Sequence, residues 1–155
     1  MSSLVVLIWL LLAGQAAAQS PVSPLDGVWE GHRKRVPLGD CRSTGPARVT
    51  VTFWTEPDQS LRGRFTRASG APGEFDLTAA MKGGKVAVTA PRVADCGGNT
   101  RRYTVTLEGT VGTDASGHRV LTLSGVDQTC PAMACSFRDE YALTWMRTAP
   151  GPAAR

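Results

Sequence analysis

The chain has 155 residues, of which 42% are hydrophobic, and a formal net charge of +4 at pH 7. This length supports one domain with its own core and is short for two ordinary domains. The charge excess is too mild to indicate a nucleic-acid partner. It is compatible with an anionic molecule or an acidic protein as partner, and also with a solvated surface that binds nothing.

The N-terminus is typical of a secretory leader. Residues 4–13 form an apolar run, and Ala16, Ala17 and Ala18 supply the small residues of a cleavage site, which we place after Ala18. The run is too short to cross a bilayer, so no stable membrane insertion is expected. We therefore predict an exported protein, periplasmic or secreted, with residues 1–18 as signal peptide, 19–25 as flexible lead-in, 26–148 as one domain and 149–155 as disordered tail.

The rest of the chain alternates apolar and polar residues in short runs separated by turn residues, which predicts β-strands joined by hairpins. Gly83 and Gly84 give the strongest turn signal, because a tight hairpin turn needs positive φ angles. An eight-stranded up-and-down antiparallel barrel would leave no open sheet edge, and a β-sandwich is the alternative. The predicted strands are 26–36, 47–54, 61–67, 74–81, 85–90, 101–108, 119–124 and 135–147.

Gly27-Val28-Trp29 lies on the first predicted strand, and Arg147 lies at the end of the last one. These two short features resemble the calycin superfamily, the lipocalin-like and avidin-like barrels. The resemblance implies that Trp29 plugs the closed end of the barrel and that Arg147 packs on it. The helix that follows the barrel in lipocalins has no room here.

All four cysteines follow the leader, which predicts two disulfides in an oxidising compartment. In an up-and-down barrel the connections alternate between the two ends, so all four fall at one end, on long loops. This end should be an open mouth and the other end closed. Three pairings are possible, and the simplest joins Cys130 to Cys135 and Cys41 to Cys96.

The same alternation predicts the residues that point inward. The interior of eight strands is either filled by them or leaves room for one small ligand, and both possibilities stay open. The predicted inward residues are Val49, Val51, Phe53, Leu61, Phe65, Phe75, Leu77, Met81, Val86, Val88, Tyr103, Val105, Leu107, Leu121, Leu123, Tyr141, Leu143 and Trp145.

At the mouth end of the strands, most of the charged residues at inward positions are arginines. One interpretation is that Arg33 pairs with Asp139 while the other arginines extend into water. The other is that the mouth holds a carboxylate, phosphate or sulfate group bidentately by Arg67 and Arg101, with Tyr103 and Tyr141 below. The candidate ligand-binding residues are Arg33, Arg35, Arg67, Arg92, Arg101, Tyr103 and Tyr141.

No pattern of catalytic or metal-ligating residues stands out, so we predict no catalytic residues, no metal, no cofactor and no enzymatic activity. Glu30 and His32 share a strand face, but they point outward if Trp29 points inward. Arg48, Arg62 and Arg64 form an outward basic stripe, which we interpret as a solvated face.

The sequence thus predicts an exported binding barrel that takes a small anionic or amphipathic ligand at its mouth. The alternative is a protein-binding barrel, such as an inhibitor of an extracellular hydrolase that uses its disulfide-fixed loops. An exported enzyme is the third possibility.

Overall fold

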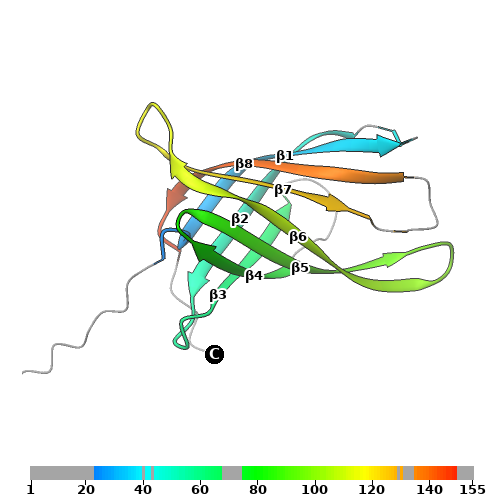
Figure 1. Ribbon diagram of the computed structural model, residues 1–155, viewed down its shortest axis with the longest axis horizontal. Coiled ribbons are helices and arrows are strands. Elements are labelled where there is room, and N and C mark those ends of the chain that lie inside the picture. The colour runs from blue at the N-terminus through cyan, green and yellow to red at the C-terminus, as the bar shows by residue number, and fades with distance from the viewer. Residues whose placement is uncertain are drawn as a thin grey trace, which may run out of the picture.

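The structure, a computed structural model, is an all-β closed barrel in which each strand pairs with the next along the chain and β8 pairs with β1 (Figure 1). It describes residues 23–39, 41–42, 44–67, 75–128, 130 and 135–149, with the backbone alone at 44, 67 and 135. The strands are β1 (Gly27–Gly39), β2 (Thr44–Thr55), β3 (Leu61–Arg67), β4 (Phe75–Lys82), β5 (Lys85–Asp95), β6 (Thr100–Thr113), β7 (Arg119–Asp127) and β8 (Cys135–Arg147).

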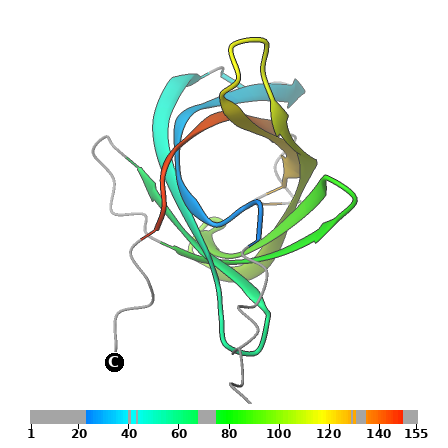
Figure 2. The ribbon, with the colours of Figure 1, turned by 90° about the vertical axis from the view of Figure 1, so that its left-hand side faces the viewer.

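The predicted up-and-down barrel is confirmed and the sandwich alternative is wrong. All eight ladders are antiparallel, and Figure 2 shows the strands forming a ring. The predicted turn at Gly83 and Gly84 joins β4 to β5, with φ angles of 57° and 78°. Leader residues 1–18 lie outside the described residues.

Two prolines lie inside strands that were predicted to end at them. β1 continues through Pro37 to Gly39, and β5 continues through Pro91 to Asp95. Pro37 lies beyond the last β1–β2 pair, Arg35 with Thr44, and keeps only its β8 partner. Pro91 lies beyond the last β4–β5 pair and keeps only its β6 partner. A strand with one partner tolerates a missing N–H donor, which explains both cases.

The interior is filled by side chains. All the predicted inward residues belong to one core or pack against it. A cavity beneath the mouth has a volume of about 10 Å³, roughly the space of one water molecule. Beneath the mouth, the described strands therefore enclose a packed core and not a ligand-sized chamber.

The closed end is plugged by the segment that precedes β1. Leu25 was predicted to belong to a flexible lead-in, but it is fully buried. Its carbonyl oxygen accepts a hydrogen bond of 2.7 Å from Trp29 Nε1, and the Nε1 of Trp145 donates to the carbonyl oxygen of Asp26 at 3.1 Å. The lead-in thus becomes part of the core where two tryptophans need acceptors for their indole N–H groups.

The cation on the buried tryptophan is Arg119, from β7, and not Arg147. The guanidinium carbon of Arg119 lies 5.4 Å from the ring centre of Trp29 and 4.9 Å from that of Trp145. Arg119 also donates to the carbonyl oxygen of Pro24. Arg147 pairs through its backbone with Val28 at the outer end of β8, and its side chain is exposed. The expected contact between Arg147 and Trp29 is therefore wrong.

Candidate anion-binding mouth

Charged and phenolic side chains from five strands meet at the end of the barrel that carries the cysteines. Strand register brings them together: Arg35 is opposite Asp139 across β1 and β8, and Arg92 is opposite Tyr103 across β5 and β6. We call this set the mouth. Its described members are Arg33, Arg35, Arg92, Arg101, Tyr103, Asp127, Asp139 and Tyr141.

Two of the arginines are neutralised by two buried carboxylates. Arg35 donates through Nε to Asp139 at 2.9 Å and through Nη2 to Asp127 at 2.7 Å. Arg33 Nε lies 3.4 Å from the same oxygen of Asp139. Desolvation opposes the charge on Arg35, yet the hydrogen bond and the charge of Asp139 outweigh it and raise the Arg35 pKa. We call these four residues the ion-pair network.

The network agrees in part with one of the two sequence interpretations. Arg33 pairs with Asp139 as that interpretation expected, but Arg35 does not extend into water. Its guanidinium bridges both carboxylates and lies 4.7 Å from the ring centre of Phe137. Two positive and two negative charges in one buried group leave the network neutral.

Arg92 has no carboxylate partner in the described part of the mouth. Its guanidinium carbon lies 3.5 Å from the ring centre of Phe75, which itself stacks on Phe65 at 4.5 Å. Among the described residues, Arg92 Nε is the one buried side-chain nitrogen or oxygen without a hydrogen-bond partner. Within the same residues its two Nη groups have no partner either, and they remain accessible. Burial lowers the Arg92 pKa, and the nearby Tyr141 and Asp127 offset this effect only in part.

The two tyrosines frame this arginine. Tyr141 is buried on β8 and, with Arg92, lines the small cavity under the mouth. Burial, followed by the negative charge of Asp139, raises the Tyr141 pKa, so its hydroxyl stays protonated and can donate. Tyr103 lies beneath Arg101, whose guanidinium carbon is 5.8 Å from the ring centre.

Arg67 cannot be placed at the mouth by its side chain. Its backbone pairs with Val49 at the end of β3, and its side chain lies outside the described residues. The expected bidentate grip by Arg67 and Arg101 therefore stays a prediction.

A disulfide fixes the part of the barrel wall that carries three mouth residues. The β4–β5 ladder ends at Thr78 and Thr89 and the β6–β7 ladder at Glu108 and Ser124, whereas β5 and β6 stay paired to their tip. Residues 90–95 and 100–105 therefore form a two-stranded extension, which Figure 1 shows reaching beyond its neighbours. We call it the β5–β6 arm; it carries Arg92, Arg101 and Tyr103.

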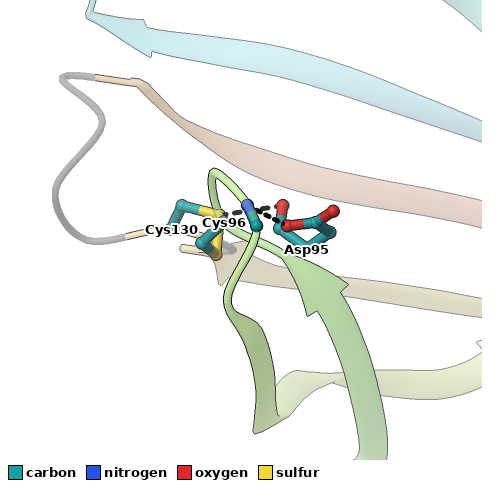
Figure 3. The surroundings of a disulfide bond; sticks show 4 residues. Asp95, Cys96 and Cys130 are labelled. Carbon is teal, nitrogen blue, oxygen red and sulfur yellow. Dashed lines mark hydrogen bonds between the residues drawn. A yellow bond between two sulfur atoms is a disulfide. The ribbon is translucent and has the colours of Figure 1, made fainter.

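The tip of this arm is bonded to Cys130, which follows β7. The Cys96–Cys130 bond has a Cα–Cα distance of 5.6 Å, and Figure 3 shows it beside Asp95. Asp95 accepts a hydrogen bond from Gly98 N at 2.7 Å, which tightens the tip. The expected pairing of Cys130 with Cys135 and of Cys41 with Cys96 is wrong, because the arm brings Cys96 to Cys130. Cys41 is disulfide-bonded as well, and no cysteine among the described residues is free.

Two features of the outer face agree with the interpretation of a solvated surface. Glu30 forms an exposed pair with Arg48 at 3.0 Å, and Arg64 pairs with Asp76 at 3.1 Å. Such pairs contribute little to stability. Glu30 and His32 point outward, as the alternation predicted.

Phe75, which contacts the mouth residue Arg92, was assigned by sequence reasoning only to the core. Its inward position was predicted, but its second role as the surface on which Arg92 lies was not. The signal was present: Phe75 begins β4 and Arg92 is near the end of β5, so both lie at the mouth end of adjacent strands.

Comparisons with protein-family models, curated proteins and solved structures found no match. In the described part of the chain, no group of three His, Cys, Asp or Glu side chains is arranged to hold a metal ion. No helix among those residues is long and apolar enough to cross a membrane.

Proposed function

We propose that this protein is an exported, non-enzymatic binding barrel that recognises an anionic group at its mouth. The observation that carries the proposal is Arg92, a half-buried guanidinium that has no carboxylate partner in the described structure although Arg33 and Arg35 have theirs. Burial has already removed part of the water around the Arg92 guanidinium, which destabilises its positive charge. An anion bound to Arg92 would stabilise that charge.

Two further features support a binding role. The Cys96–Cys130 bond holds the arm and therefore limits the freedom that Arg92 and Arg101 would lose on binding. The disulfide-bonded cysteines also fit an oxidising compartment, which agrees with the predicted leader. Membership of the calycin superfamily stays a prediction, carried by Gly27 and Trp29 alone now that Arg147 is exposed.

A protein partner is the second candidate, and the filled interior favours it. With about 10 Å³ of free space under the mouth, the barrel cannot enclose a ligand as a hollow barrel does. An acidic side chain on a partner's loop would reach Arg92 from outside as well as a small molecule does. Binding a protein partner in this way requires the mouth residues but no ligand-sized cavity.

The test is a calorimetric titration with three small probes that differ in charge: butyrate, butyl phosphate and neutral 1-butanol. We expect the charged probes to bind wild-type protein, more weakly at high than at low ionic strength, and 1-butanol not to bind. The Arg92→Met/Arg101→Met variant should lose most of this binding while its circular dichroism stays that of the wild type. Equal affinity of both proteins, or no binding of either charged probe, would contradict an anion-binding mouth.

A further inference from the structure

We propose that the mouth selects a monocarboxylate, held by the terminal Nη edge of Arg92, with the body of the ligand left outside the barrel. This rests on the proposed anion-binding function and names its ligand class. Three observations carry it: the charge balance of the mouth, the geometry of Arg92 and the depth of the interior.

The charge balance favours one negative charge. Arg33 and Arg35 are already matched by Asp127 and Asp139, which are 4% and 1% exposed. Of the other two mouth arginines, Arg101 lies over Tyr103. Arg92 lines the small cavity and has no described carboxylate within ion-pair distance. Asp127 already interacts favourably with the charge on Arg92, so a singly charged group matches Arg92 more closely than sulfate or doubly charged phosphate does.

The geometry of Arg92 favours a flat, two-oxygen group. The guanidinium carbon lies 3.5 Å from the ring centre of Phe75 and 5.9 Å from that of Phe65, and these two rings are stacked on each other. Contact with both rings restricts the orientation of the guanidinium. Nε is buried, which closes the side of the guanidinium formed by Nε and one Nη. The edge formed by the two Nη groups is left, and its two parallel N–H bonds match the two oxygens of a carboxylate.

The depth of the interior restricts the chain that a carboxylate ligand can carry into the barrel. The cavity beneath Arg92 is lined by Tyr141 and by apolar core residues, and its volume of about 10 Å³ admits no chain of methylenes. A longer acyl chain therefore finds no further surface to bury in the barrel. Each buried methylene would otherwise raise affinity about fourfold.

The experiment compares butyrate, hexanoate and octanoate with inorganic phosphate and sulfate at constant ionic strength, by calorimetric titration. We expect the three carboxylates to bind with similar affinities and more tightly than the dianions. Arg92→Met should weaken carboxylate binding at least tenfold, and Arg92→Lys should weaken it too, because an ammonium group offers no fork. Arg102→Met is the matched control: it removes an exposed arginine from the same arm and should change nothing.

The outcomes separate this inference from the proposed function. Tighter binding of phosphate or sulfate, an affinity that rises about fourfold per methylene, or loss in Arg101→Met but not in Arg92→Met would overturn the monocarboxylate site and leave an anion-binding mouth. No binding by any anion would overturn both. A native circular dichroism spectrum and thermal midpoint for Arg92→Lys guard against a loss that reflects misfolding.

Discussion

Leu25 shows how one side chain decides where this domain begins. It lies in a Ser- and Pro-containing stretch that has no strand pattern, yet none of its surface is exposed. Ser23 organises the turn around it: Ser23 Oγ accepts a hydrogen bond from Leu25 N, and its carbonyl oxygen accepts one from Asp26 N. A single apolar residue carries no periodicity, so the sequence could not show that this turn closes the barrel.

We predict that Leu25→Ala destabilises the domain by about 2–5 kcal/mol, because it deletes a buried side chain and leaves a cavity. Urea denaturation monitored by tryptophan fluorescence gives the free energy of unfolding. Val93→Ala is the control, since Val93 is 67% exposed and its truncation should change stability by about 0.5 kcal/mol or less. Equal effects of the two substitutions would show that Leu25 does not plug the barrel.

Asp139 is the residue on which the ion-pair network depends. It receives the guanidinium of Arg35 and lies 3.4 Å from Arg33 Nε. Asp139→Asn keeps the size of the side chain but leaves two buried cations facing one carboxylate, so we expect a loss of about 3–5 kcal/mol. Asp76→Asn removes the exposed partner of Arg64 and should cost about 1 kcal/mol or less. Chemical denaturation of both variants checks this, and a loss at Asp139 no larger than at Asp76 would refute the network's structural role.

Among the described strands, the ladders of β4 and β7 end before the β5–β6 arm begins. One disulfide at the tip of the arm, Cys96–Cys130, holds it. The arm exists because the β5 strand continues past Pro91 with β6 as its one partner among the described strands. A sequence pattern reports the alternation of a strand but not how many neighbours the strand has. For that reason Pro37 and Pro91 look like strand ends in the sequence although both strands continue.

Loss of the Cys96–Cys130 bond should weaken both stability and binding. The bond closes a loop of sequence separation 34, for which loop-closure entropy gives about 4 kcal/mol. The Cys96→Ala/Cys130→Ala variant should also bind anions more weakly, since the arm that carries Arg92 is released. Denaturant titration measures the first effect and calorimetry the second. Peptide mapping without reduction should recover Cys96 joined to Cys130; a Cys130–Cys135 fragment would contradict the arrangement.

For the molecule as a whole, the alternation of inward and outward side chains along the sequence was sufficient to predict the architecture. It placed the cysteines at one end and predicted the inward residues, because side-chain direction alternates along every strand regardless of register. It also brought Arg33, Arg92 and Tyr141 to the same rim.

Side-chain alternation could not predict which residues pair within the mouth, because pairing depends on the register between strands. It also could not predict whether the interior is filled, because that depends on side-chain volume. The β1–β8 ladder sets Arg35 opposite Asp139, which makes Arg35 and not Arg33 the main partner of that carboxylate. Whether the interior was hollow depended on how closely Phe53, Phe65 and their neighbours pack, which no strand pattern reports. The disulfide pairing depended on the reach of the arm.

The ladder that closes the barrel also sets the order in which the molecule can be completed. It joins Val28 to Arg147 at one end and Gly39 to Cys135 at the other, and the Arg35–Asp139 bond within it spans 104 residues. Contacts of such separation form slowly, because the chain entropy must be lost before they stabilise anything. During synthesis β1 therefore keeps an open edge until β8 has emerged. The mouth cannot exist in a partly made chain, so the capacity to bind an anion should appear only with the last strand, together with the closed ring.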